Sequence, residues 1–108
     1  MAELDNNSST TILIDVELDP TGAQVVVLSG ELDSSNVAQL EAKVASITAE
    51  SSRPLIFDLT GLQFMDSAGI AALIGAATKT SVSLRNPSPV IRRVLKATGL
   101  SGVLAIEP

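Results

Sequence analysis

The chain has 108 residues and a net charge of −5, and 45% of its residues are hydrophobic, enough to build the core of one small domain. It contains no cysteine and no histidine, which excludes disulfides, thiolate metal sites and the commonest general base of enzymes. The N-terminal residues are acidic and polar, unlike a secretory signal, and no apolar run is long enough to cross a bilayer. We therefore expect a cytoplasmic protein that does not bind membranes, with a flexible segment at residues 1–11 and a single domain at residues 12–108.

The charges are unevenly distributed along the chain. Residues 1–50 carry nine acidic side chains and one basic side chain, whereas residues 51–108 carry six basic and three acidic ones. Because the total is acidic, we expect no direct binding to nucleic acids. The four basic residues from Arg85 to Lys96 are interpreted as a solvated helix face, with a phosphate-binding groove as the alternative.

The first half of the chain predicts a β-hairpin followed by a helix. Apolar residues alternate through residues 12–18, as in a half-buried strand, and residues 25–28 are all apolar, as in a strand covered on both faces. Residues 19–22, with the sequence Asp-Pro-Thr-Gly, predict the turn between them, because proline presets φ and glycine tolerates a positive φ. Residues 30–36 are interpreted as a loop rich in helix-capping residues, and apolar residues then recur at helical spacing over residues 37–47.

The second half predicts alternating strands and helices. Residues 60–63 are interpreted as a connector, and Ser88-Pro89 predicts a helix start because serine caps well and proline suits the first helical position. The resulting order, β-β-α-β-α-β-α-β, predicts an α/β fold with a mixed sheet, parallel βαβ units and helices packed on the sheet. The predicted strands are residues 55–59, 82–85 and 103–106, and the predicted helices are residues 70–77 and the segment that begins at Ser88-Pro89.

Ser67 lies in the segment Phe64-Met65-Asp66-Ser67-Ala68-Gly69, between a predicted strand and a predicted helix. A helix N-terminus has backbone N–H groups without partners and a partial positive charge, so it can hold a negative group such as a phosphate. A serine that gains and loses a phosphate there would act as a charge switch. Two plainer interpretations stay open: Ser67 is only the helix cap, or Asp66 is the cap and Ser67 lies in the first turn.

Three motifs in order resemble those of one protein family. They are Leu28-Ser29-Gly30-Glu31-Leu32-Asp33, the stretch from Asp58 to Gly69, and the stretch from Asn86 to Leu100. On these motifs the chain resembles a STAS domain, and specifically a bacterial anti-sigma factor antagonist, over residues 12–106. The resemblance implies a STAS-like mixed sheet.

The resemblance also implies a partner and a switch. In this family the unphosphorylated protein binds an anti-sigma factor, often itself a serine kinase, and so frees a sigma factor for transcription. The kinase phosphorylates the serine after the motif aspartate, which weakens binding, and a Ser/Thr phosphatase resets the protein. No cofactor or bound metal is implied, and we expect a monomer or a weak dimer. Carried over to this chain, Ser67 is the phosphorylated residue, and the partner-binding residues are Asp33, Asp66, Ser67, Ala68 and Gly69.

Two features depart from the family pattern. Ala68 stands where members commonly have a second serine or threonine, and the segment after the second helix is shorter than usual. Two other functions therefore stay open: an accessory STAS subunit of a transport or lipid-trafficking complex, and a module that senses a small ligand or nucleotide. An enzyme is disfavoured, because Ser67 has no evident activating base.

Overall fold

The computed structural model describes residues 11–99 and 104–107. The expected flexible segment therefore lies outside the described residues apart from Thr11, and so does Val103 of the last predicted strand. The elements follow the predicted order. They are β1 (Ile12–Leu18), β2 (Gln24–Leu32), α1 (Val37–Glu50), β3 (Leu55–Met65), α2 (Ser67–Ala77), β4 (Val82–Arg85), α3 (Pro89–Ala97) and β5 (Ala105–Ile106).

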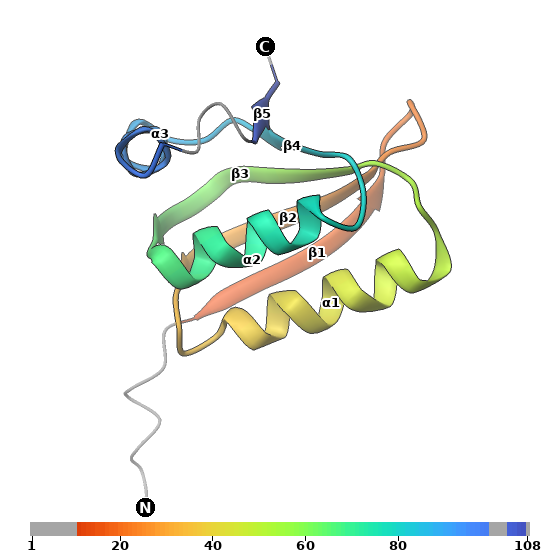
Figure 1. Ribbon diagram of the computed structural model, residues 1–108, viewed down its shortest axis with the longest axis horizontal. Coiled ribbons are helices and arrows are strands. Elements are labelled where there is room, and N and C mark those ends of the chain that lie inside the picture. Colours follow the sequence, from red (N-terminus) through yellow and green to blue (C-terminus); the bar gives the residue numbers. More distant parts are fainter. Residues whose placement is uncertain (1–10, 100–103, 108) are drawn as a thin grey trace, which may run out of the picture.

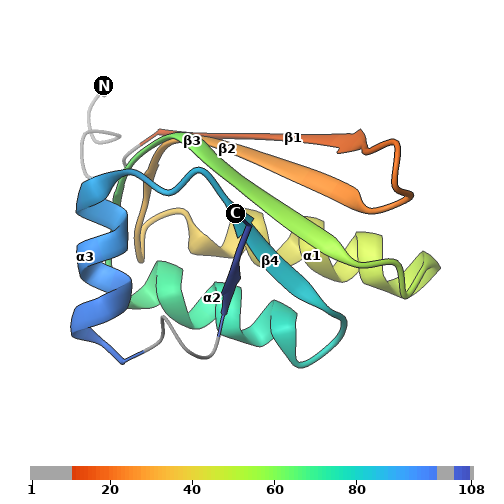
Figure 2. The same ribbon diagram turned by 90° about the horizontal axis from the view of Figure 1, so that it is seen from above.

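The strands form one sheet in the order β1-β2-β3-β4-β5, in which β1 is antiparallel to β2 and every other neighbouring pair is parallel. Helices α1 and α2 lie on one face of this sheet, and α3 lies at the end where the parallel strands finish (Figures 1 and 2). The predicted α/β fold with a mixed sheet and packed helices is therefore confirmed. Within the described ranges, none of the helices has both the length and the apolar character needed to cross a membrane.

The main core lies between the sheet and the two helices that cover it. Val26, Phe57 and Leu84 lie side by side on three neighbouring strands, and each is 0% exposed. Leu40 of α1 and Leu73 of α2 belong to the same buried cluster. Side chains alternate between the two faces of a strand, so the face that carries Val26, Phe57 and Leu84 is the one that the helices cover.

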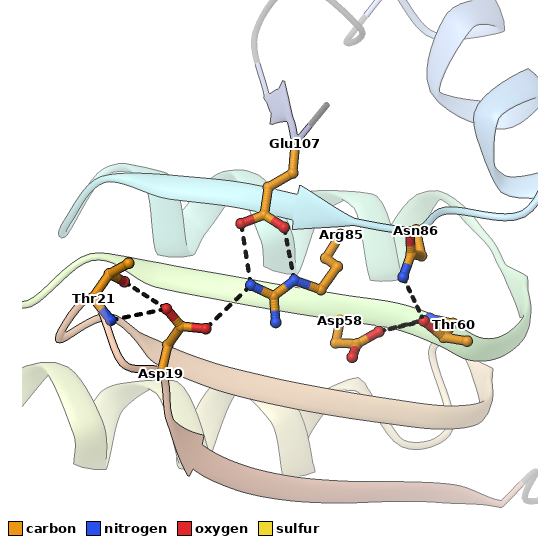
Figure 3. Close-up of polar contacts among 7 residues, drawn as sticks. All are labelled: Asp19, Thr21, Asp58, Thr60, Arg85, Asn86 and Glu107. Atoms are coloured by element: carbon orange, nitrogen blue, oxygen red, sulfur yellow. Dashed lines mark hydrogen bonds and ion pairs between the residues drawn. The ribbon is translucent and has the colours of Figure 1, made fainter.

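Two segments that the sequence predicts as loop or connector are strand instead. β2 continues through residues 30–32, and β3 continues through residues 60–63. The pairing between β2 and β3 shifts twice between Val27 and Glu31, and at each shift β3 contains one residue more than β2, as at a β-bulge. The carboxylate of Asp58 accepts hydrogen bonds from the backbone N–H and the hydroxyl of Thr60, at 3.0 and 2.6 Å (Figure 3). These bonds stabilise the bulged strand.

An ion-pair network lies on the other face of the sheet, which no described helix covers (Figure 2). Arg85 extends across β3 and pairs with Glu107 at 2.7 Å and with Asp19 of the hairpin turn at 3.3 Å (Figure 3). The hydrogen bonds that its guanidinium group donates to the Glu107 carboxylate raise the pKa of Arg85 above its usual range. The pKa of Asp19 is lowered, chiefly because its carboxylate accepts a hydrogen bond from the hydroxyl of Thr21. The interpretation of Arg85 as part of a solvated helix face is therefore wrong, because Arg85 lies on β4 and forms an ion pair with the hairpin turn.

Candidate functional site

The N-terminus of α2 is capped by Asp66. Its carboxylate accepts hydrogen bonds from the N–H groups of Ala68 and Gly69, at 2.9 and 3.1 Å, and its carbonyl accepts the first helical bond from Ile70 at 3.1 Å. An acidic cap suits this position, because it satisfies two helix N–H groups and faces the positive end of the helix dipole. Of the two plainer interpretations of the sequence, the structure therefore favours Asp66 as the cap over Ser67.

Ser67 is the first residue of α2, and its side chain is exposed. Its hydroxyl forms no hydrogen bond with any described residue. The nearest helix N–H groups, those of Ala68 and Gly69, already bind the carboxylate of Asp66. These two N–H groups are therefore not free to bind a phosphate, in contrast to the general expectation for a helix N-terminus. A phosphate on Ser67 would lie beside the Asp66 carboxylate and add to its charge.

Gly69 positions the first turn of α2 against the ends of β2 and β3. A Cβ atom at Gly69 would lie 2.7 Å from Cγ of Met65 and 3.0 Å from Cδ2 of Leu32, both of which are fully buried. The backbone N–H of Asp66 also donates to the carbonyl of Leu32 at 3.2 Å. The absence of a side chain at Gly69 is therefore what allows the cap and Ser67 to sit close to the end of the sheet.

Asp33 follows the last residue of β2 directly, so the same backbone bond that holds Asp66 brings the Asp33 loop beside the start of α2. The carboxylate of Asp33 accepts hydrogen bonds from the N–H and the hydroxyl of Ser35, at 2.9 and 2.6 Å. Its carbonyl accepts the N–H groups of Asn36 and Val37. Asp33 is half-buried and organises the turn before α1, whereas the cap position itself is Asn36.

Sequence reasoning missed the role of Asn36. This side chain is 2% exposed, accepts a hydrogen bond from the N–H of Asp33 at 3.0 Å and donates to the carbonyl of Glu31 at 2.8 Å. It therefore fixes the loop that carries Asp33. The only signal in the sequence is its place at the end of a run of capping residues, which does not distinguish it from its neighbours.

The structure separates the five predicted partner-binding residues by accessibility. Ser67 is exposed, Asp33, Asp66 and Ala68 are half-buried, and Gly69 is buried. Any part that Gly69 has in recognition is therefore indirect, through the position of α2.

Two further features lie at the same end of the sheet. Phe64, two residues before the cap Asp66, is 45% exposed, whereas Met65 between them is buried in the core. Helix α3 lies at this end of the sheet as well (Figures 1 and 2). Its Arg92, Arg93 and Lys96 are exposed, as predicted for a solvated basic helix face.

Comparison with known proteins shows the family and the fold of the chain. The sequence profile of the STAS domain matches residues 15–108. An anti-sigma F factor antagonist of Lysinibacillus sphaericus is 39% identical over 82 residues, which cover 70% of this chain and 70% of that protein. The crystal structure of an anti-sigma factor antagonist from Mycobacterium paratuberculosis superposes with a TM-score of 0.80 at 29% identity, covering 91% of this chain and 86% of the other.

The anti-sigma factor antagonist SpoIIAA of Bacillus has been solved in two forms, both 28% identical to this chain. The unphosphorylated form has a TM-score of 0.72 and covers 89% of each chain. The phosphorylated form has a TM-score of 0.65 and covers 89% of this chain and 92% of the other. With its sheet order, its capped second helix and these relatives, the chain belongs to the STAS domain family.

Proposed function

We propose that this chain is an anti-sigma factor antagonist whose affinity for its partner is controlled by phosphorylation of Ser67. The observation that carries the proposal is the exposed hydroxyl of Ser67 at the first position of α2, next to the capping carboxylate of Asp66. The relatives named above are anti-sigma factor antagonists, and one of them has been solved with and without phosphate. This supports a regulatory binding protein that acts on transcription and not an enzyme.

The position of Asp66 gives the switch its direction. Phosphorylation adds about −1.5 to −2 charges at neutral pH. Because the Asp66 carboxylate already binds the two nearest helix N–H groups, this charge is not neutralised there and faces the partner. A partner surface that accommodates a hydroxyl would meet a dianion, and an unpaired buried charge costs about 2–5 kcal/mol. That corresponds to a loss of about 30-fold to several-thousand-fold in affinity.

The proposed partner surface is the end of the sheet formed by Asp33, Asp66, Ser67 and Ala68, to which we add the exposed ring of Phe64. The proposed partner is an anti-sigma factor with serine kinase activity in the cytoplasm, and a Ser/Thr phosphatase would remove the phosphate. Residues 12–108 are proposed to act as a single STAS domain. This partner surface would be rigid, since the Asp33 loop and the α2 cap are both held by hydrogen bonds.

The proposal is tested by incubating the protein with its cognate kinase and ATP and by measuring partner binding of Ser67→Ala and Ser67→Glu. Intact mass should rise by one phosphate in the wild type and not in Ser67→Ala. Ser67→Ala should retain the partner and Ser67→Glu should lose it, while Ser46→Glu, at an exposed serine of α1, serves as the matched control. Equal recovery of the partner by all variants would contradict the switch. Recovery of a membrane transport complex instead would support the accessory-subunit alternative.

A further inference from the structure

β1 is the outermost strand, and its outer backbone groups are unpaired within the described part of the chain. The N–H of Glu31 donates to the carbonyl of Thr11 at 3.0 Å, and the N–H of Asp19 donates to the carbonyl of Ala23 at 2.8 Å. Opposed residues of an antiparallel pair alternate between hydrogen-bonded and non-hydrogen-bonded positions. The odd-numbered residues of β1 therefore bond to β2, and the even-numbered ones direct their N–H and C=O groups outward. The residues whose backbone N–H and C=O groups point away from β2 are Ile12, Ile14, Val16 and Leu18.

The side chains along this edge have two distinct characters. Val16 and Leu18 lie on the helix-covered face, and they are 38% and 65% exposed although they are apolar. They border a hollow of about 450 Å³, whose other lining residues include the acidic Glu50 at the C-terminal end of α1 and the basic Arg53 after it. On the opposite face of the strand, Asp15 and Glu17 are exposed and acidic, and the apolar Leu13 beside them is 64% exposed. The edge therefore combines free backbone groups, an apolar side with adjacent space, and an acidic side.

We propose that the free edge of β1 binds an extended basic segment of another protein, which adds to the sheet as a further strand. Backbone hydrogen bonds to the outward groups of β1 would provide the main attachment. In this arrangement the segment places apolar side chains against Val16 and Leu18, and lysine or arginine side chains against Asp15 and Glu17. Opposite charges across neighbouring strands are favourable, so the acidic pair selects a cationic segment.

A second copy of this chain is a poor occupant of the same edge. Antiparallel pairing of two β1 strands over their full length would place Ile12 opposite Leu18, and Asp15 of one copy opposite Asp15 of the other. Like charges in directly opposed positions destabilise a strand pair, and each copy carries a net charge of −5. The charge pattern thus disfavours self-pairing and favours a basic partner.

The part of this edge formed by Val16 and Leu18 is separate from the Ser67 surface, whereas its Ile12 end lies at the same end of the sheet as that surface. Because β1 is antiparallel to β2, Leu18 pairs with Gln24 at the start of β2, whereas Ser67 follows the end of β3 at the other end of the sheet. Binding at the edge can therefore be measured without the anti-sigma partner. Failure of one proposal leaves the other unaffected.

The test uses a blocked seven-residue peptide of alternating lysine and valine and follows backbone amide resonances during a titration. We expect changes and slower hydrogen exchange at Ile12, Ile14, Val16 and Leu18. A peptide of the same composition with its lysines and valines in two blocks should bind at least about tenfold more weakly, because it cannot place all its charges on one face. Equal binding of the two peptides, changes centred elsewhere, or dimerisation through β1 would overturn the proposal.

Two sets of variants distinguish strand addition from general charge attraction. Val16→Pro removes an outward N–H without removing a bond to β2, and it should weaken binding at least about tenfold, whereas Val16→Ala, which keeps the N–H, should weaken it less. A thermal melt checks that each variant is folded. In the charge-reversed variant Asp15→Lys/Glu17→Lys, preference should change to an alternating glutamate and valine peptide. Retention of the lysine preference in that variant would overturn the proposal independently of the proline result.

Discussion

Replacing Gly69 by alanine should show how tightly the start of α2 is packed. The new Cβ would lie 2.7 Å from Cγ of Met65 and 3.0 Å from two atoms of Leu32, closer than carbon atoms normally approach. Both neighbours are almost completely buried, so neither can move into solvent. Overpacking of this kind costs about 1–3 kcal/mol. Alanine also improves helix propensity by about 1 kcal/mol over glycine, so the net change in the free energy of unfolding is expected to range from about zero to a loss of about 2 kcal/mol.

Gly75 of the same helix provides the matched control, since nothing lies within 4 Å of a Cβ placed there. Gly75→Ala should therefore gain stability by up to about 1 kcal/mol. The difference between the two variants isolates the packing term and should be about 1–3 kcal/mol. It can be measured by urea unfolding followed by far-ultraviolet circular dichroism, because the chain has no tryptophan or tyrosine for fluorescence. Equal stability of the two variants would refute the close packing of α2 on Leu32 and Met65.

Three other predictions test the loop, the hairpin turn and the partner surface. Asn36→Ala removes two hydrogen bonds of a buried side chain and should lower the free energy of unfolding by about 1–3 kcal/mol; an unchanged urea midpoint would contradict its role. Thr21→Val removes the main group that lowers the pKa of Asp19, so the NMR titration midpoint of that carboxyl should rise. Because the pKa of Asp19 is lower in the folded protein than in the unfolded chain, its carboxylate stabilises the fold above the unfolded pKa of about 3.9. This stabilisation is lost as the pH falls through the folded pKa, so Thr21→Val should lose less stability on acidification than the wild type. Phe64→Ala should weaken anti-sigma factor binding about fivefold or more, whereas Leu18→Ala, an equally apolar exposed side chain at the other end of the sheet, should not.

The features that the sequence predicts correctly depend on local physical chemistry. The turn at residues 19–22 has Gly22 at a φ of +93°, and a hydrogen bond from its N–H to the carbonyl of Asp19 closes it. Ser88 caps α3 by accepting a hydrogen bond from the N–H of Ile91 at 3.2 Å, directly before the proline. In each case a few adjacent residues determine the conformation, so no knowledge of the rest of the fold is needed.

The features that the sequence does not predict depend on distant partners. Residues 60–63 are polar enough to suggest a connector, but pairing with β2 extends β3 through them by means of two register shifts. Arg85 finds Asp19 and Glu107 only because the sheet order brings β4, β5 and the hairpin to one face. Alternation in β1 predicts a strand but not the exposure of Val16 and Leu18, because periodicity gives the face of a side chain and not what covers that face.

The same limit explains why the sequence could not resolve the roles of two adjacent residues at the candidate site. Serine and aspartate are both good helix caps, so the order Asp66-Ser67 is compatible with either residue at the cap. The backbone bond from Asp66 to Leu32 resolves this, because it places Asp66 at the end of the sheet, one residue before the helix begins. Stability of the helix start then rests on the carboxylate, and the hydroxyl of Ser67 is left without a structural task among the described residues. A residue with no such task can be modified without unfolding the helix, which is the physical condition that a reversible charge switch requires.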